Sequence, residues 1–581
     1  MKLNSKILRN LMALLMVFLL IIPQGLVTKV SAEENKTKEV ILFQGEKSAK
    51  GAWGDTWATL VDIKNYDIKD METPFNLEIA YEGNGAPCVI FQSWSGGTEW
   101  GQVTASYAMK GIAYYTYDAI KEAYGSDFSK LDNICVKPFG EDVKITSVKL
   151  VSATSGEIKF DYKGTAGEIS NKITSGWNLG NTLDSFGDWI PQQTKGKTSD
   201  FETAWGNPVT TKAMINMVKK AGFNTIRVPV TWAQHFEADG TINKEWMDRV
   251  QEVVNYVIDN DMYCIINVHH DVGSAGWLWA SDNSLKKNSA KFKSLWTQIA
   301  NRFKDYDNKL LFEGFNEILD EKSTWSYPGK EATNAVNKYN QMFVDTVRST
   351  GGNNPTRCLV VNTYAASVDN NVLDDFVMPT DTVENSLILQ VHSYAPYFYC
   401  NVMSESTSQT KWKENNGKAN IDAYIQSLYH HFTSKNIPVI VGEMAAASKN
   451  NTEDRVEYTK YSVEQCHKYG IKCFWWDNGG KFEVDPKYGY ETSMGLLNRH
   501  NLTWVYPGIV KAFTGVNTDI PQTTCGLGDA NNDGKVDLMD YVALKLYLSH
   551  KYTGVMVEDN VDMNRDGVVN VKDLLILRDL I

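Results

Sequence analysis

The chain has 581 residues, of which 22% are charged and 43% hydrophobic, so disorder over most of its length is excluded and several folded units are expected. The net charge of −12 and the lack of a Lys/Arg-rich block argue against a nucleic-acid binder. The high aromatic content, with 17 Trp and 28 Tyr, favours ligands that offer flat apolar faces, such as sugars.

Residues 1–32 have the pattern of an export signal. Lys2, Lys6 and Arg9 precede an unbroken apolar run over 11–22, and Val30-Ser31-Ala32 is a small-residue cleavage site. The apolar run is too short to cross a hydrocarbon core of about 30 Å, so no membrane contact is expected after cleavage. The sequence therefore predicts a secreted, extracellular protein.

The eight cysteines do not indicate a disulfide framework. They are scattered and include no Cys-x-x-Cys pair, which argues against a zinc site and against a redox motif. Cys264, Cys358 and Cys473 lie in apolar strands, where we expect buried free thiols.

Short strands with alternating hydrophobicity fill residues 38–152, for example at 75–81, 89–94 and 145–151, and predict a β-sandwich. Six aromatic residues of this region are candidates for a sugar-binding platform: Trp94, Trp100, Tyr107, Tyr114, Tyr115 and Tyr117. Because strands bury alternate residues, we expect half or more of them in the core. Residues 153–170 are irregular and bear Gly, Ser and Thr, and we expect a linker there.

From 171 to 516 the pattern changes to alternating strands and helices. Eight apolar strands are predicted, at 176–181, 225–230, 263–270, 310–317, 358–364, 387–394, 438–444 and 472–478. Amphipathic segments such as 211–221 and 246–260 lie between them. This order predicts a closed (β/α)8 barrel. A doubly wound open sheet is the alternative, although no Gly-x-Gly-x-x-Gly follows the first strand.

After a polar linker at 517–524, residues 525–581 contain one twelve-residue pattern twice, starting at Asp529 and at Asp562. Positions 1, 3, 5, 9 and 12 bear side-chain oxygens in both copies, and position 6 is glycine (Gly534 and Gly567), which predicts two structural Ca²⁺ sites. The predicted ligands are Asp529, Asn531, Asp533, Asp537 and Asp540 in the first loop, and Asp562, Asn564, Asp566, Asn570 and Asp573 in the second. An apolar helical run follows each copy, so this unit is predicted to be all-α.

Polar side chains end the predicted barrel strands, at the face where such barrels carry their active sites. They are Arg227, His269, His270, Asn316, Glu317, His392, Tyr394, Glu443 and Asp477, with Trp475 or Trp476 beside the last. Glu317 and Glu443 end the fourth and seventh strands, on opposing sides of the barrel mouth. Glycoside hydrolysis requires two such carboxyl groups, one to protonate the leaving oxygen and one to attack the anomeric carbon or activate water.

The neighbours of this pair suit the same chemistry. Arg227 would keep the attacking carboxylate ionised, and Tyr394 could donate a hydrogen bond to it. Asn316 is placed to hold a sugar 2-hydroxyl, and Trp476 offers an apolar floor for the ring. A metal hydrolase using His269, His270, Asp271 and His392 is disfavoured, because adjacent residues of a strand point to opposite faces.

Six motifs resemble glycoside hydrolase family five, the cellulase family A: Gly176–Asn181, Thr203–Pro208, Ile226–Trp232, Asn267–Asp271, Phe312–Glu317 and Val439–Met444. The first motif and Trp475–Gly479 resemble subfamily four. The resemblance implies a retaining endo-β-1,4-glucanase without a catalytic cofactor, with Glu317 as acid/base and Glu443 as nucleophile. It also implies that His269, His270, His392 and Tyr394 bind substrate. Ile318 follows Glu317 where the family often has proline, which concerns the shape of the loop and not the carboxylate.

The duplicated tail resembles a type I dockerin, the calcium-dependent module that binds a cohesin of a cellulosome scaffold. Asp at position 12, in place of the Glu of an EF-hand, fits this resemblance. The preferred polymer stays open among cellulose, xyloglucan, lichenan and mannan. A catalytically silent carbohydrate-binding or scaffold-docking protein is the alternative from another class, and the presence of both Glu317 and Glu443 argues against it.

Overall fold

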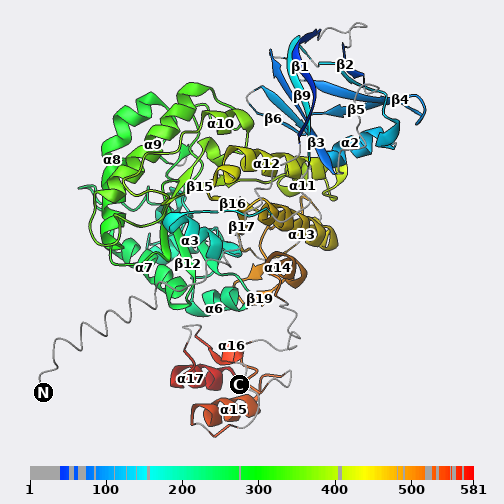
Figure 1. Cartoon of the computed structure of the whole chain (residues 1–581). Coiled ribbons are helices and arrows are strands. Elements are labelled where there is room, and N and C mark those ends of the chain that lie inside the picture. Colours follow the sequence, from blue (N-terminus) through cyan, green and yellow to red (C-terminus); the bar gives the residue numbers. More distant parts are fainter. Residues whose placement is uncertain are drawn as a thin grey trace, which may run out of the picture.

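The computed structural model describes residues 39–50, 58–62, 74–152, 158–516 and 527–581, apart from gaps at 84, 86, 110, 126, 139, 274–275, 404–407, 481, 484, 489–490, 532–534, 550, 553–557 and 565–567. The predicted export signal and Cys525 lie outside these residues. The described chain forms a β-sandwich, a closed barrel and a small helical unit, in that order (Figure 1). Its helices include none that is both long and apolar enough to cross a membrane.

The sandwich consists of two antiparallel sheets, with strand orders β1-β9-β3-β7-β6 and β2-β8-β4-β5. Its elements are β1 (Glu39–Ala49), β2 (Ala58–Asp62), β3 (Phe75–Glu82), β4 (Cys88–Ser93), β5 (Thr98–Thr104), β6 (Tyr107–Met109), β7 (Ile112–Tyr115), α2 (Tyr117–Tyr124), β8 (Asn133–Val136) and β9 (Val143–Ser152). In β3, Phe75, Leu77 and Ile79 alternate with partly exposed residues, because successive side chains of a strand face opposite sides. The buried side chains of both sheets form one core, as the sequence predicts.

Eight parallel strands form the barrel, and β17 closes onto β10 by pairing Trp475 with Trp177. The strands are β10 (Gly176–Leu179), β11 (Thr225–Val228), β12 (Tyr263–Asn267), β13 (Leu310–Glu313), β14 (Leu359–Asn362), β15 (Leu387–His392), β16 (Val439–Met444) and β17 (Ile471–Asp477). The closed barrel is therefore confirmed and the open-sheet alternative is wrong. Six of the eight strands are buried at every residue, which explains why they appear in the sequence as continuous apolar runs.

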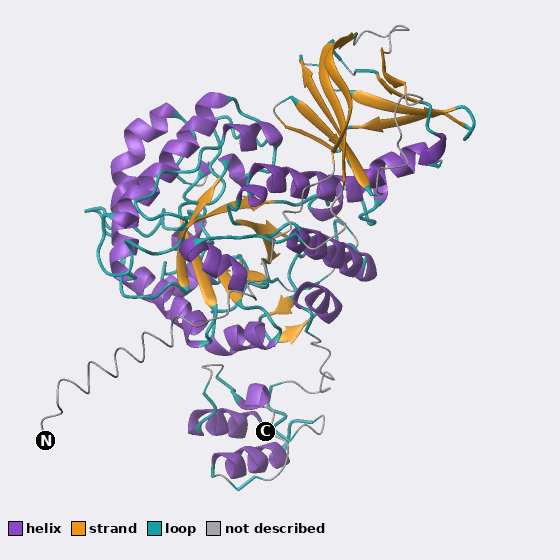
Figure 2. Cartoon of the chain, viewed as in Figure 1, coloured by secondary structure: helices purple, strands orange, loops and turns teal. Residues whose placement is uncertain are grey.

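Helices surround the barrel (Figure 2). They are α4 (Trp189–Gln193), α5 (Thr198–Glu202), α6 (Lys212–Lys220), α7 (Lys244–Asp259), α8 (Asp282–Arg302), α9 (Lys330–Arg348), α10 (Asn370–Asp375), α11 (Tyr397–Cys400), α12 (Gly417–His431), α13 (Thr452–Lys468) and α14 (Pro507–Thr514). A short hairpin of β18 (Leu497–Asn498) and β19 (Thr503–Trp504) precedes α14. The seven described cysteines are free and buried, as expected for those in apolar strands.

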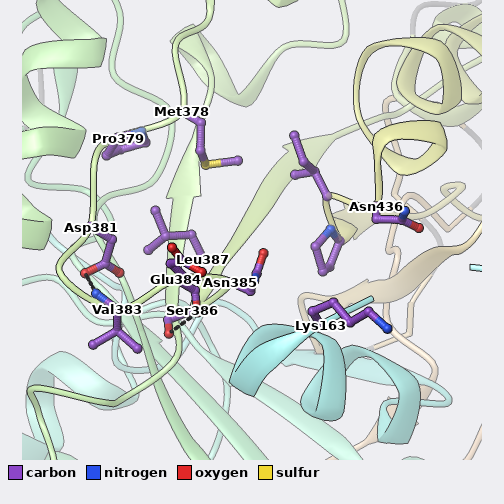
Figure 3. Close-up of a pocket in the computed structure, with 12 residues that line it drawn as sticks. Lys163, Met378, Pro379, Asp381, Val383, Glu384, Asn385, Ser386, Leu387 and Asn436 are labelled. Carbon is purple, nitrogen blue, oxygen red and sulfur yellow. Dashed lines mark hydrogen bonds between the residues drawn. The ribbon is translucent and has the colours of Figure 1, made fainter. Parts of the chain in front are cut away.

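Part of the predicted linker is a helix, α3 (Gly164–Lys172), which corrects the sequence analysis. Its two glycines give it a low intrinsic helix propensity, so that packing stabilises it. Ala166, Ile169 and the following Ile173 join the apolar cluster of side chains inside the barrel. A cavity of about 310 Å³ lies beside this helix, with Lys163 on one side and residues 378–387 on another (Figure 3). It lies where β15 and β16 begin, at the face that serves stability in this fold.

The helical unit at the C-terminus contains α15 (Leu538–Leu548), α16 (Glu558–Val561) and α17 (Val571–Leu580). Ala543 and Leu544 of α15 pack with Val561 and Leu577 in a small core. Asp537 and Asn570 cap α15 and α17 with the same reciprocal hydrogen bonds, as expected for a duplicated sequence. The all-α prediction for this unit is confirmed.

Candidate active site

A cleft of about 1140 Å³ opens where the barrel strands end. It is lined by every predicted catalytic and substrate-binding residue except Arg227: His269, His270, Asn316, Glu317, His392, Tyr394, Glu443 and Trp476. Arg227 is fully buried. Several strands are shorter than predicted, since β12 ends at Asn267 and β13 at Glu313. The histidine pair and Glu317 therefore lie in the loops that leave the barrel.

His392 lies between the two predicted catalytic carboxylates. Its Nδ1 is 2.7 Å from Oε1 of Glu317 and 3.5 Å from Oε2 of Glu443. One oxygen of each carboxylate and the imidazole nitrogen all lie within 4.8 Å of one another. Retaining glycosidases separate their carboxyl groups by about 5–5.5 Å, whereas inverting ones need about 6.5–9.5 Å to admit a water molecule. The spacing therefore matches direct attack by one carboxylate.

Glu443 is held in its ionised form. Arg227 donates from Nη1 to Oε1 of Glu443 at 2.7 Å, and the Tyr394 hydroxyl donates to Oε2 at 2.9 Å. Burial raises the pKa of Glu443, but the neighbouring His392 and Arg227 and the hydrogen bonds from Arg227 and Tyr394 outweigh it, so that the pKa is lowered below its ordinary value. This electrostatic environment is the one that a carboxylate nucleophile requires.

A third carboxylate, Glu313, holds Arg227 from the other side and is absent from the sequence analysis. Its Oε2 accepts from Nε of Arg227 at 2.6 Å and its Oε1 from Nη2 at 2.8 Å, and both side chains are 0% exposed. Burial lowers the pKa of Arg227, but Glu313 and Glu443 raise it above its ordinary value. The same Nη2 reaches Oδ1 of Asn316 at 2.9 Å. The sequence contains a signal that could identify Glu313 as a functional residue, because this carboxylate ends an apolar strand within the Phe312–Glu317 motif.

Trp476 presents a ring to the cleft, and His269 supports it. The two rings are parallel within 4° and their centroids are 5.7 Å apart. Burial lowers the pKa of His269 well below its ordinary value, so its imidazole is neutral. Gly180 lies against the six-membered ring of the Trp476 indole. A Cβ at position 180 would be 2.8 Å from this ring, so the close approach requires glycine.

His270 lies beside the buried carboxylate of Asp184, with 3.8 Å between Nε2 and Oδ2. Burial lowers the pKa of His270 to about 4 and raises that of Asp184 to about 6. With His269 they place three metal-ligating atoms within 4.8 Å, so the argument that adjacent histidines must point apart is wrong here. The reason is that β12 ends at Asn267, before both histidines. Asp184 already accepts the N–H groups of residues 181 and 182, which accounts for its burial.

The two predicted calcium loops make the same backbone hydrogen bonds in the residues that the structure describes. Asp540, at position 12 of the first loop, accepts the N–H groups of Asn531 and Asp537 at 3.1 and 2.7 Å. Asp573 accepts the equivalent groups of positions 3 and 9 at 3.2 and 2.8 Å. The carboxylates at positions 1 and 12 are at most 4% exposed, and such converging oxygens fit Ca²⁺. The ligands predicted at position 5, Asp533 and Asp566, lie outside the described residues.

Two of the six candidate platform residues in the sandwich are exposed, Trp94 (59%) and Trp100 (46%). The other four are tyrosines with different surroundings. Tyr115 belongs to the sandwich core, Tyr117 packs against Phe75 and Phe128, and Tyr107 and Tyr114 face the barrel helix α12. The expectation that half or more of the six lie in the sandwich core is therefore wrong: only Tyr115 is in the core and Tyr117 packs against it, whereas Tyr107 and Tyr114 are buried by the barrel.

Three family models match the chain. The model for cellulases of glycosyl hydrolase family 5 matches residues 183–482, that for carbohydrate binding module 65 domain 1 matches 43–148, and that for the type I dockerin domain matches 527–581. Endoglucanase B of Clostridium cellulovorans is 39% identical over 389 residues, which cover 66% of this chain and 83% of that protein.

Solved structures resemble the barrel closely. A GH5-4 broad specificity endoglucanase from Ruminococcus champanellensis with bound cellotriose is 43% identical with a TM-score of 0.55, and the match covers 61% of this chain and 100% of that one. A glycoside hydrolase 5 lichenase from Caldicellulosiruptor sp. F32 in complex with cellotetraose is 40% identical with a TM-score of 0.56, covering 63% and 98%.

Proposed function

The chain belongs to glycoside hydrolase family 5, the cellulase family, and we propose that it is a retaining endo-1,4-β-glucanase in which Glu443 is the nucleophile and Glu317 the acid/base. The observation that carries the assignment of roles is the asymmetry of the pair. His392, a guanidinium and a hydroxyl lower the pKa of Glu443, which is nearly fully buried, whereas the side chain of Glu317 is more exposed and contacts only His392 of these groups. An ionised nucleophile facing a carboxyl group at this spacing supports double displacement.

In the first step an oxygen of Glu443 attacks the anomeric carbon while the bond to the leaving sugar breaks. Glu317 gives its proton to the leaving oxygen, and a glycosyl ester forms on Glu443. Arg227 donates to both Glu443 and Glu313 and keeps its positive charge, so it balances Glu443 before attack and still pairs with Glu313 when the ester has formed. His392 stays within hydrogen-bond distance of Glu317 and orients it.

In the second step Glu317, now ionised, takes a proton from water, whose oxygen bonds to the anomeric carbon as the ester breaks. Glu443 leaves as a carboxylate, and the two inversions restore the original configuration. Arg227 binds Oδ1 of Asn316, which leaves the amide nitrogen of Asn316 to donate to a sugar hydroxyl. We assign to it the 2-hydroxyl, and to Trp476 and the two histidines the ring of the attacked sugar.

The cleft favours cleavage within a polymer. Its volume of about 1140 Å³ exceeds the usual size of a small-molecule pocket, about 300–1,000 Å³, so it has room for several sugar units of a chain. We propose a β-1,4-linked glucan as the substrate. Mixed-linkage glucan is the second candidate, because the barrel is similar to a lichenase crystallised with a β-1,4 oligosaccharide.

The other two modules bring the barrel to its substrate and to its partner. Carbohydrate binding module 65 domains bind glucans, and we assign this role in the sandwich to the exposed Trp94 and Trp100. A type I dockerin implies a cohesin partner and generally binds calcium, and we place one Ca²⁺ in each loop, at Asp529 to Asp540 and at Asp562 to Asp573. These roles require an extracellular location on a cellulosome scaffold.

Three measurements test the assignment. A 2-fluoro glycoside that traps the covalent intermediate should label Glu443, as located by mass spectrometry of the digested protein. NMR of the first product of carboxymethylcellulose or cello-oligosaccharide hydrolysis should show the β-anomer. Glu443→Gln and Glu317→Gln should each lose turnover by orders of magnitude while the protein stays folded. Release of the α-anomer, or a label on another residue, would refute the mechanism.

A further inference from the structure

The sandwich is docked against one side of the barrel through an aromatic stack. The rings of Tyr107 and Tyr114, cross-strand partners on β6 and β7, are 4.5 Å apart and nearly parallel. The His430 imidazole of α12 lies against both, at 4.8 Å from Tyr114 and 5.6 Å from Tyr107. Burial lowers the pKa of His430 to about 4, so a neutral ring faces the tyrosines. Figure 1 shows the sandwich beside α12.

The tyrosine pair does not belong to the sandwich core. On β7, Ala113 and Tyr115 point into that core, so Tyr114 between them points outward. A tyrosine on the outer face of an isolated sandwich would be exposed to water, yet Tyr107 and Tyr114 are each only 6% exposed. Their burial therefore comes from the barrel, where β6 contacts both α10 and α12.

A second contact joins the modules at the other end of α12. Asp118 of α2 pairs with Lys418, in the first turn of α12, at 2.8 Å. The ion pair is largely exposed and contributes little by itself. With the aromatic stack near the last turn, however, it gives α12 two points of contact with the sandwich along its length.

The barrel helices α10 and α12 carry part of the cleft wall. Asn420, in the first turns of α12, lines the cleft, and so do Ser367 and Val368, just before α10. The two helices are tied together, since Ser427 of α12 bonds to Asn370 and His431 lies 3.0 Å from Asp374. A sandwich that contacts both helices thus restrains α12 and the loop before α10, which together form one side of the cleft.

We propose that the sandwich braces the α10–α12 wall of the catalytic cleft, a function separate from its binding of glucan. Removing the docking contacts lets this wall move, and Ser367, Val368 and Asn420, which line the cleft, lose their fixed positions. Because small displacements of positioning groups slow catalysis, the loss extends to substrates too short to touch the sandwich.

The test uses the full chain and an aryl β-cellobioside, which occupies only the cleft. Tyr107→Ala with Tyr114→Ala removes the stack from the sandwich side, and His430→Ala removes it from the barrel side. Both should lower kcat/KM for this substrate severalfold, and calorimetry should show separate unfolding of sandwich and barrel in place of one joint transition. The control Lys130→Ala, at an exposed sandwich residue outside the aromatic stack and the Asp118–Lys418 pair, should change neither.

A charge exchange keeps the test informative if the tyrosine variant does not fold. Asp118→Lys places two cations together and should lower kcat/KM, and adding Lys418→Asp should restore it. Unchanged kcat/KM in His430→Ala and in Asp118→Lys would overturn the brace, whether or not the joint transition splits. The unmodified chain tests the proposed glucanase activity in the same assay, since its failure to turn over refutes that activity and not the brace.

Discussion

Replacing Glu313 with glutamine tests how the buried charges of the cleft are balanced. Glu313 and Arg227 are both 0% exposed and share two short hydrogen bonds. Removing one partner of a buried ion pair costs about 3–5 kcal/mol of unfolding free energy. The glutamine oxygen still accepts one of the two bonds and Arg227 keeps Glu443, so we expect the lower end of this range, about 3 kcal/mol.

The same substitution changes the nucleophile. Arg227 is no longer shared, so its full charge acts on Glu443, whose pKa is already lowered, and lowers it further. The nucleophile is active when ionised, and the acid limb of kcat/KM therefore moves to lower pH. We also expect kcat to fall about 10- to 100-fold, because Arg227 loses one of its two bonds to residue 313 and Asn316, which it also binds, moves with it.

Chemical denaturation and a pH–rate profile measure the two effects separately. Glu464→Gln is a matched control: it breaks a surface pair with Lys460 and should change the unfolding free energy by less than about 1 kcal/mol. If Glu313→Gln matched the unmodified chain in both stability and acid limb, then Glu313 would not balance Arg227, and the account of the cleft electrostatics would be wrong.

Three further outcomes follow from described contacts. Tyr394→Phe removes a hydrogen bond to a charged acceptor, about 1.5–3 kcal/mol, so the pKa of Glu443 and the acid limb of kcat/KM should rise by about 1–2 units in a pH–rate profile. Trp476→Ala should lower kcat/KM for cello-oligosaccharides, because the sugar ring loses its apolar floor, whereas near-wild-type kinetics would exclude that contact. EDTA should abolish cohesin binding and the circular dichroism of residues 527–581 without stopping turnover of soluble glucan. Asp529→Ala with Asp562→Ala should do the same, and loss of turnover would contradict a purely structural role for calcium.

The barrel was predictable because its signal is local. Strands buried at every residue appear as apolar runs, and the polar side chains that follow them mark the active face. Glu317 and Glu443 are predictable in this way, since Glu443 is the next-to-last residue of β16 and Glu317 lies four residues after the end of β13. The ends of the strands are harder to predict, because the apolar pattern continues past the last hydrogen bond between strands. The sequence therefore predicts a strand to residue 270, whereas β12 ends at Asn267 and His269 and His270 lie in the loop.

Glu313 and α3 were missed for reasons of distance in the chain. The bond between Arg227 and Glu313 joins residues 86 positions apart, so neither neighbourhood in the sequence records it. α3 has glycines where a stable isolated helix would have better helix formers, and it forms because Ile169 and Ile173 fill the barrel interior. The Arg227–Glu313 bond and the helix α3 both depend on contacts between residues far apart in the sequence, which local sequence preferences do not determine.

The adjacent tyrosines of β7 show what a sequence can reveal about contacts between modules. Successive side chains of a strand face opposite sides, so a sandwich strand with one face in water exposes one member of each neighbouring pair. Tyr114 and Tyr115 are both buried, one by the barrel and one by the sandwich core. Two large aromatic residues in succession on a sandwich strand thus indicate that its outer face is covered. The sequence fits a bound sugar or a neighbouring domain equally well, and the parallel ring of His430 in the structure favours the domain.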